Sequence, residues 1–435
     1  MESLWKATAV KPQFKRQTGK IKTDVLIVGG GIAGILCAYL LDRAGADYTL
    51  IESDEICGGV TGDTTAKITL QHGLIYHKLN EYFGRDYAKA YYSLQKEALE
   101  SYARLCGNID CDYRRRDSAV YSLDDRAKLE SEYKVLESIG ADAQLVTELP
   151  LPLKICGGIK IPDQAEFNPL KFLYSISSGL NILEHTKAEE FTTGGVKTNR
   201  GMIDADRIVI ATHFPIINKH GGYFIKMYQH RSYVIALENA PDVRGMYIDC
   251  DDRGMSFRNS GDLLLLGGGG HRTGKKGGGW RELESFAEKA FPGSRIKYRW
   301  ATQDCMTLDS VPYVGEYSSG TRNLYVTTGY GKWGMTNAMV SAVILKGMLL
   351  GHKPDYIDVF SPSRSVFRPQ LLNNIGESLL GMVTPRVPRC PHLGCALKYN
   401  RAEHSWDCSC HGSRFTENGE LINGPATGDM KRKRK

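Results

Sequence analysis

A dinucleotide-binding turn near the N-terminus constrains the fold of this chain most strongly. Asp24-Val25-Leu26-Ile27-Val28 predicts a buried parallel strand, which runs into Gly29-Gly30-Gly31-Ile32-Ala33-Gly34. A helix is expected over residues 35–43, and the next strand, 48–51, ends at Glu52. A G-x-G-x-x-G between strand and helix, with an acidic residue about twenty positions later, is the context that the dinucleotide fingerprint requires. The pattern predicts that the glycines approach a pyrophosphate and that Glu52 binds the adenosine ribose.

A loop of small polar residues follows this unit. Gly58–Lys67 is rich in glycine and threonine, so its hydroxyl and backbone N–H groups are suited to a phosphate or a flavin edge, and an ordinary surface loop is the alternative. Residues 72–135 are expected to be mostly helical. His72 and His77 lie close to the loop in sequence, and each is interpreted either as a catalytic or as a structural histidine. A further loop, 161–169, is expected to lead into a helix capped by Asn168.

The middle of the chain has the alternation of an antiparallel sheet. Short strands are expected over 232–237, 245–249, 256–259 and 262–266, and Gly277-Gly278-Gly279-Trp280 is expected to open a loop. We interpret this sheet as a substrate-side domain inserted in the nucleotide-binding domain. Four of its residues are candidates to face a substrate carboxylate, with a structural ion pair or a surface position as the alternative for each. These candidates are Arg231, Tyr247, Arg258 and His271.

A second strand–turn–helix pattern follows. Residues 309–315 and 324–328 predict strands, and Gly329–Thr336 is a glycine-rich turn before the apolar helix expected over 337–350. The N-terminus of a helix favours negative charge, so this turn predicts another anion site.

Two Cys/His pairs stand near the C-terminus. They are Cys390-x-His392 and Cys408-x-x-His411. Two thiolates and two imidazoles can hold one zinc ion or divide between the two irons of a [2Fe–2S] cluster. Each pair comes with one more cysteine and one glycine, and a zinc finger has no use for a fifth and a sixth sulfur. The pattern favours the iron–sulfur cluster, with a zinc site or a structural clasp as the alternative.

Composition adds limits on the class of protein. The 435 residues suggest about three domains, and no apolar run is long enough to span a bilayer. The N-terminus lacks the apolar core of a signal peptide, and the cysteines outside the two Cys/His loops have no repeated spacing, so we expect a cytoplasmic protein with reduced thiols. The net charge is +7, partly from the basic tail 431–435, which is expected to be solvated and not to bind nucleic acid.

The segment 22–350 resembles the glycine oxidase/D-amino-acid oxidase superfamily of FAD-dependent oxidoreductases. The matching pieces are the first glycine-rich turn, the small-residue loop, the strand ending in Ala211-Thr212, where His213 replaces a usual glycine, and the last strand–turn–helix. The resemblance implies that FAD is bound, with Ala188 at the adenine and Gly331–Met335 at the flavin ring. The FAD-binding residues it implies are Gly29, Gly31, Ile32, Ala33, Gly34, Glu52, Gly59, Thr61, Thr64, Thr65, Lys67, Ala188, Thr212, Gly315, Gly331, Lys332, Trp333, Gly334 and Met335.

The segment 388–430 resembles the Rieske iron–sulfur motif of cytochrome bc complexes. The resemblance implies that Cys390 and Cys408 bind one iron, that His392 and His411 bind the other, and that Cys395 and Cys410 form a disulfide. Gly424-Pro425-Ala426 resembles the proline loop that covers the cluster.

Two departures from the Rieske pattern matter. Phe415 replaces a tyrosine that hydrogen-bonds a cysteine sulfur, so we expect a lower reduction potential. Residues 371–380 read as a helix and leave no room for strands before Cys390. We therefore expect a truncated unit that depends on the rest of the protein for its core.

Together these patterns predict an α/β protein. It has a Rossmann-like FAD-binding domain, an inserted antiparallel β-sheet substrate domain and a small truncated all-β Rieske domain. The expected segments are a basic arm (1–20), the FAD-binding domain (21–225 and 300–365), the substrate-side sheet (226–299), a helical linker (366–387), the Rieske domain (388–430) and the tail (431–435).

Both halves together resemble a bacterial family of FAD-dependent oxidoreductases with a C-terminal Rieske domain. FAD accepts two electrons as a hydride, and a [2Fe–2S] cluster carries one electron. We expect a small substrate, such as an amine or amino acid, to reduce FAD, and the cluster to pass single electrons to an unidentified protein or quinone. Two alternatives remain: an external donor reduces the cluster and FAD reduces the substrate, or the Rieske unit is a structural or docking module on a flavin oxidase.

Overall fold

The computed structural model describes residues 2–217, 219–251, 254–352, 357–385 and 387–430. Its first sheet is the expected Rossmann-like sheet. β1 (Ile21–Val28) pairs in parallel with β2 (Tyr48–Ile51) and β10 (Gly201–Ile210), and β10 pairs in parallel with β17 (Leu324–Thr328). The strand order is β16 (Tyr313–Glu316), β17 (Leu324–Thr328), β10 (Gly201–Ile210), β1 (Ile21–Val28), β2 (Tyr48–Ile51), β7 (Ile182–Leu183), with the hairpin β8 (Ala188–Thr192) and β9 (Gly195–Thr198) attached to β10.

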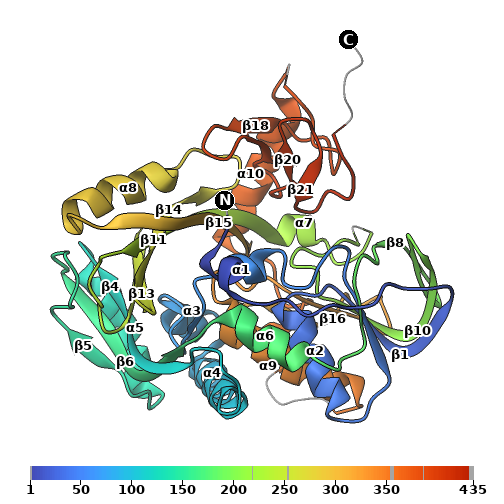
Figure 1. The fold of residues 1–435 in the computed structure, drawn as a ribbon, viewed down its shortest axis with the longest axis horizontal. Helices are drawn as coiled ribbons and strands as arrows, with labels where there is room; N and C mark the ends of the chain where they lie inside the picture. Colours follow the sequence, from blue (N-terminus) through green and yellow to red (C-terminus); the bar gives the residue numbers. More distant parts are fainter. Residues whose placement is uncertain (1, 218, 252–253, 353–356, 386, 431–435) are drawn as a thin grey trace.

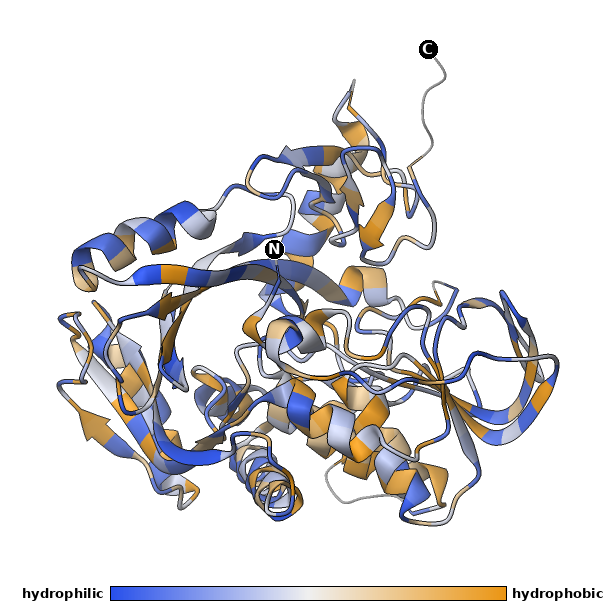
Figure 2. Ribbon diagram, viewed as in Figure 1, coloured by the Kyte–Doolittle hydropathy of each residue, from blue (hydrophilic) through white to orange (hydrophobic). Residues whose placement is uncertain are grey.

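Two apolar helices pack together beside this sheet. α2 (Ile32–Asp42) begins at the first glycine-rich turn, and α9 (Gly334–Leu349) begins at the second. Eleven of the sixteen residues of α9 are buried, which explains why its sequence is apolar on most sides. Figure 2 shows these apolar stretches as orange segments where the helices meet the sheet. The two helix N-termini therefore point toward the same region, at the carboxyl ends of β1 and β17.

The second sheet is larger than the sequence indicated. Its order is β15 (Arg295–Thr307), β11 (Met227–Glu238), β14 (Leu263–Arg272), β13 (Ser256–Ser260), β12 (Met246–Asp249), β4 (Arg114–Ser122), β6 (Gly157–Glu166), β3 (Lys67–Ile68), and β5 (Gln144–Val146) pairs with β6.

The sheet thus extends outside the expected segment 226–299, because β3 to β6 come from earlier in the chain. β4 lies in a region expected to be helical, and β6 lies partly where a loop was expected. A register shift between Arg116 and Ser118 lets β6 accommodate Pro162 and the positive φ of Asp163, the residues that hid this strand.

The remaining helices cover the two sheets (Figure 1). Asn168 caps α6 as predicted, because its side chain accepts hydrogen bonds from the backbone N–H groups of Leu170 and Lys171. Gly279 opens a helix where a loop was expected. These elements are α1 (Leu4–Thr8), η1 (Val60–Asp63), α3 (Ile75–Phe83), α4 (Arg85–Cys106), α5 (Arg126–Ser138), α6 (Pro169–Ser177), α7 (Tyr223–Lys226), α8 (Gly279–Ala290) and η2 (Ile357–Phe360).

The C-terminal domain, residues 387–430, is a small antiparallel sheet that follows α10 (Pro369–Val383). Its strands are β18 (Leu397–Asn400), β19 (Ser405–Cys408), β20 (Arg414–Thr416) and β21 (Leu421–Asn423). As expected, a helix and not a strand precedes Cys390. The domain's own buried apolar cluster has only seven members, four of them cysteines, so its packing against β11, β14 and β15 supplies much of its support (Figure 1). The tail 431–435 lies outside the described residues.

Candidate functional site

One cavity of about 790 Å³ lies between the two large sheets, with the first glycine-rich turn, the small-residue loop and the second glycine-rich turn in its wall. Most residues predicted to hold FAD line it, although they come from segments more than 300 positions apart. They are Gly29, Gly31, Ile32, Ala33, Glu52, Gly59, Thr61, Thr64, Thr65, Lys67, Thr212, Gly331, Lys332, Trp333, Gly334 and Met335.

Close backbone approach explains the first glycine-rich turn. Gly29 has a φ of +115°, and a Cβ there would lie 2.6 Å from the carbonyl oxygen of Ala211. A Cβ on Gly34 would lie 1.9 Å from the carbonyl oxygen of Gly29, so Gly34 packs the helix onto the strand, as expected, and does not line the cavity. The Glu52 carboxylate accepts a hydrogen bond from Gly30 N at 2.7 Å. The turn is therefore fixed beside the carboxylate that is predicted to bind ribose.

The N-terminal segment holds the small-residue loop in place. Trp5 is fully buried, and its Nε1 donates to the carbonyl oxygen of Thr64 at 2.6 Å. Lys6 forms an ion pair with Asp63 at 2.8 Å. Part of the expected basic arm is thus packed against the cavity wall. The hydroxyl of Thr61 accepts a hydrogen bond from Ile32 N at 3.0 Å, which ties the loop to the start of α2.

Besides Gly34, two predicted FAD-binding residues lie outside the lining. Ala188 pairs with Thr198 in the β8–β9 hairpin, and its neighbour Lys187 lines the cavity instead. Gly315 lies in β16, where a Cβ would lie 3.5 Å from Pro362. Its φ of +134°, which side chains rarely adopt, explains the glycine.

His72 is the one predicted catalytic candidate that lines the cavity. Nδ1 is 2.7 Å from the Tyr91 hydroxyl, Nε2 is 2.9 Å from the Thr336 hydroxyl, and the ring stacks on Trp333 with centroids 5.1 Å apart. Burial lowers the pKa of His72 to about 3. The imidazole is therefore neutral at ordinary pH and links helix α9 to the loop that precedes α3. His77, by contrast, is partly exposed and lies near Glu81 on α3.

The other four candidates make structural contacts away from the cavity lining. Arg231 pairs with Glu403 of the C-terminal domain. Arg258 is fully buried, lies 3.4 Å from Glu166, and donates to the backbone carbonyls of Thr65 and Ala66. The Tyr247 hydroxyl donates to the Val243 carbonyl, and His271 Nε2 lies 3.1 Å from the Tyr233 hydroxyl.

Three cavity residues were not singled out as site residues from the sequence. Asp304 of β15 lines the cavity, and burial raises its pKa to about 6. His213 has a φ of +65°, burial lowers its pKa to about 4, and no described residue hydrogen-bonds its buried Nε2. Its place at the end of β10, where a glycine is usual, was the one available signal. Gln229 of β11 carried no local signal, because its role depends on the C-terminal domain.

The two Cys/His loops have the same backbone form. Gly394 N donates to the Cys390 carbonyl at 2.9 Å, and Gly412 N donates to the Cys408 carbonyl at 3.0 Å. Both glycines have positive φ. The loops face each other, so that the rings of His392 and His411 have centroids 5.0 Å apart.

The four predicted ligands therefore converge, and they fit a [2Fe–2S] cluster. The Nδ1 atom of His411 is buried and accepts or donates no hydrogen bond within the described residues, as expected for a metal-binding nitrogen. Gly424 approaches so closely that a Cβ there would lie 2.3 Å from Ser413 Cα, and Ser413 Oγ accepts a hydrogen bond from Ala426 N at 3.1 Å. The predicted proline loop thus covers the second Cys/His loop.

The two extra cysteines also come together. The sulfurs of Cys395, Cys408 and Cys410 all lie within 4.8 Å of one another. Cys395 and Cys410 are both thiols in this structure, so the predicted disulfide stays a prediction.

Comparison with known proteins identifies both halves. Residues 24–348 match the family model described as FAD dependent oxidoreductase, and residues 376–433 match the Rieske [2Fe-2S] domain. The chain belongs to the FAD-dependent oxidoreductase family. It carries a Rieske domain at its C-terminal end.

Relatives of this FAD-dependent oxidoreductase share one or both halves. The Bacillus subtilis protein YhfW, named as a Rieske 2Fe-2S iron-sulfur protein, is 31% identical over 99% of this chain and 97% of its own length. Gamma-glutamylputrescine oxidoreductase of Escherichia coli is 24% identical over 80% of this chain and 89% of its own length.

Solved structures confirm the fold of the oxidoreductase half. L-proline dehydrogenase from P. horikoshii superimposes with a TM-score of 0.66 at 19% identity, covering 79% of this chain and 98% of its own. Glycine oxidase from Geobacillus kaustophilus superimposes with a TM-score of 0.65 at 17% identity, covering 79% of this chain and 99% of its own. FAD and a [2Fe–2S] cluster are accordingly the cofactors of this oxidoreductase. Within the described residues, no helix is long and apolar enough to cross a membrane.

Proposed function

We propose that this oxidoreductase oxidises a small amine or amino acid at FAD and passes the electrons one at a time through its Rieske cluster to an external acceptor. One observation carries the proposal: the cavity predicted to hold FAD is also lined by residues 421–424 of the C-terminal domain. The Rieske domain therefore forms part of the wall of the predicted FAD cavity, which supports direct electron transfer between the two cofactors.

A buried pair of glutamines connects the two sites. Gln229 lines the cavity, and its Nε2 donates to the carbonyl oxygen of His411 at 2.9 Å. Gln303 donates to the carbonyl oxygen of Gly412 at 2.8 Å and also to Gln229. Thr273 donates to Gln303 at 3.1 Å. Each of these side chains is buried, so the network fixes the second Cys/His loop relative to the cavity wall.

The polar groups of the cavity suit a cationic or amine substrate. Asp249, which is buried, and Asp304, which is half-buried, both place a carboxyl group in the wall, and a carboxylate there is suited to pair with an ammonium group. FAD supplies the two-electron chemistry when bound, and the N-terminus of α9 at Gly334 favours negative charge beside it. The names of the relatives, which act on gamma-glutamylputrescine, L-proline and glycine, support this class of substrate.

The test is anaerobic stopped-flow spectroscopy of the purified holoprotein with a panel of amines and amino acids. We expect an active substrate to bleach the flavin first and then to reduce the cluster. The EPR signal of the reduced cluster would monitor the second step. In Gln229→Leu we expect normal flavin reduction and slower cluster reduction, because the variant loses the hydrogen bond to His411. A flavin that is reduced by substrate while the cluster stays oxidised would refute the relay. Reduction of the flavin only after an external donor has reduced the cluster would reverse its direction.

A further inference from the structure

Helix α10, which precedes the cluster loops in the chain, has its apolar side facing outward. On α10, Asn374 and Gly381 are buried, and the opposite side is formed by apolar residues that are between 41% and 74% exposed. In a protein surrounded only by water, the apolar side of a surface helix normally faces the core. The exposed residues, which we call the outer face of α10, are Leu372, Ile375, Leu379, Leu380, Met382 and Val383.

The inward side of α10 is occupied by contacts to the oxidoreductase and to the cluster loops. Asn374 accepts a hydrogen bond from Arg272 at 3.0 Å and donates to the carbonyl oxygen of Ile225 at 3.1 Å. Gly381 is packed so closely that a Cβ there would lie 2.6 Å from Cys410 Sγ, and its carbonyl accepts a hydrogen bond from Ala396 N. The helix therefore cannot turn its outer face inward without leaving the cluster loops.

Further apolar residues extend the outer face at both ends. Phe367, just before the helix, is 82% exposed. Arg389 donates to the carbonyl oxygens of Gly381 and Gly394, which holds the first Cys/His loop beside the end of α10. Leu393 of that loop is also exposed. An apolar surface of this extent is a binding surface in most soluble proteins.

Basic side chains lie beside this apolar surface. Leu372 and Leu380 share a cleft of about 530 Å³ with Lys275 and Lys276. Lys275 pairs with Glu377 of α10 at 2.6 Å, Lys276 lies beside it in the same cleft, and Arg389 at the end of α10 is exposed. Apolar side chains with basic side chains beside them are suited to an anionic lipid surface. The apolar groups enter the interface, and the basic groups contact the lipid phosphates.

We infer that the outer face of α10 binds the surface of an anionic membrane and places the Rieske cluster loops next to the lipid headgroups. The helix is too short to span a bilayer, so it lies in the interface. The inference does not depend on the substrate or on the direction of electron flow. It concerns where the cluster meets its redox partner.

The experiment is co-sedimentation of the holoprotein with vesicles of phosphatidylcholine alone or with added phosphatidylglycerol. We expect binding to the anionic vesicles that weakens as salt is added. The double substitution Leu372→Glu and Leu379→Glu should reduce this affinity by at least about tenfold, because two apolar side chains no longer enter the interface. Leu145→Glu, an exposed leucine of β5, is the matched control and should bind like the wild type.

Both altered side chains face away from the core, so each variant is expected to fold. Flavin and cluster absorbance would check this. Wild-type protein that stays in the supernatant with every vesicle would overturn the inference. So would a double variant that binds as tightly as the wild type, because charge alone would then account for binding. A wild-type dimer that the double substitution converts to a monomer, without vesicle binding, would assign the outer face to a second copy of the chain.

Discussion

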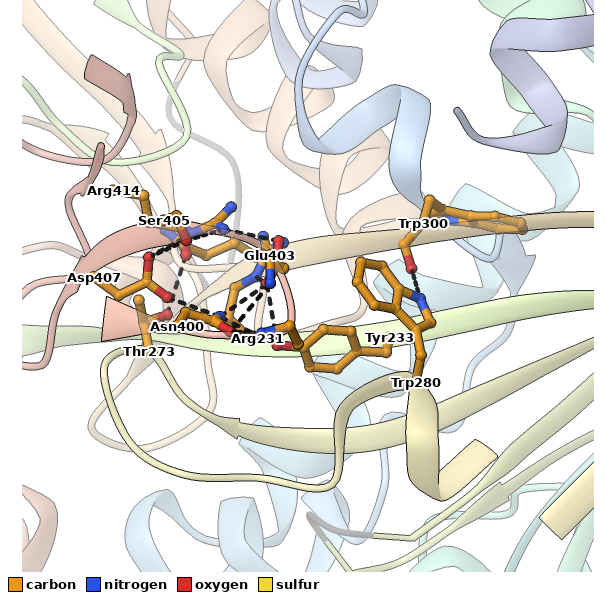
Figure 3. Close-up of polar contacts among 12 residues, drawn as sticks. Arg231, Tyr233, Thr273, Trp280, Trp300, Asn400, Glu403, Ser405, Asp407 and Arg414 are labelled. Atoms are coloured by element: carbon orange, nitrogen blue, oxygen red, sulfur yellow. Dashed lines mark hydrogen bonds and ion pairs between the residues drawn. The ribbon is translucent and has the colours of Figure 1, made fainter. Parts of the chain in front are cut away.

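We predict that loss of Glu403 strongly weakens the attachment of the Rieske domain to β11. Figure 3 shows its carboxylate between the guanidinium groups of Arg231 and Arg414. Arg414 donates to it at 2.8 Å, and Arg231 Nε donates to it at 3.0 Å. The Tyr233 hydroxyl adds a third donor at 3.0 Å. All three charged side chains are less than 10% exposed. Glu403 thus joins the Rieske domain to β11 through a buried ion network.

The size of the effect follows from this burial. Removing one member of a buried ion pair costs about 3–5 kcal/mol, because the remaining charge is left without a partner. In Glu403→Ala two guanidinium groups lose a shared carboxylate, although Arg414 keeps Asp407 at 3.0 Å. We therefore expect a loss of about 3–5 kcal/mol in the free energy of unfolding of the Rieske domain. Arg231→Met combined with Glu403→Leu should recover much of it, since no buried charge is left on β11.

The assay is urea unfolding of the holoprotein, followed by visible circular dichroism of the cluster and by flavin fluorescence. The cluster signal should be lost at lower urea in Glu403→Ala, while the flavin signal shifts less. Glu417→Ala is the control, because Glu417 also forms an ion pair in the Rieske domain but is 56% exposed. A cluster transition that moves no further in Glu403→Ala than in Glu417→Ala would refute the reasoning.

The same network predicts a pH dependence. Burial acts to raise the pKa of Glu403, but the charges of Arg231 and Arg414 outweigh it and hold the pKa below its usual value of 4.5. The stabilisation is therefore complete above pH 4.5 and is lost as the pH falls through the lower folded-state pKa. Urea unfolding of the wild type at falling pH should approach that of Glu403→Ala.

Three more predictions concern the cofactor sites. Glu52→Ala should weaken FAD binding by about tenfold or more, since it removes the predicted ribose acceptor and the hydrogen bond from Gly30 N. Fluorescence titration of the apoprotein would measure this, and unchanged affinity would contradict the assignment. His411→Ala should abolish the EPR signal of the reduced cluster while the protein keeps its flavin, and a retained signal would assign that iron to other ligands. Burial and the charge of Arg258 lower the pKa of Lys67 from 10.5 to about 7. Between pH 7 and 10.5 the unfolded chain then binds more protons than the folded protein. The wild type should therefore lose thermal stability relative to Lys67→Met as the pH falls from 10.5 toward 7. If the thermal stabilities of the two proteins changed in parallel with pH, this would count against the lowered pKa.

Local chemistry made both cofactors predictable. A pyrophosphate requires glycines and a helix N-terminus within a few residues, and the turn 29–34 supplies them in the predicted form. The cluster requires its ligands on two short loops, and both loops have the expected glycine turns. These demands are met by contiguous residues, so the sequence displays them without knowledge of the fold.

Long-range contacts were not predictable in the same way. Arg231 was interpreted as a possible substrate ligand, but its partner is Glu403, 172 positions away. β4 and β6 were missed because a bulge, a proline and a polar start interrupt their alternation. Gln229 became part of the site only when the Rieske domain was placed against β11.

The sequence by itself determined the two cofactors and the Rossmann-like core of this protein, because glycine turns, metal ligands and apolar strands act over a few residues each. Only the tertiary structure decided which charges are paired, that the cavity is shared with the Rieske domain, and that α10 exposes its apolar side. An amphipathic helix has the same sequence pattern whichever side faces the core. The contacts of Asn374 and Gly381 with distant segments decided that orientation.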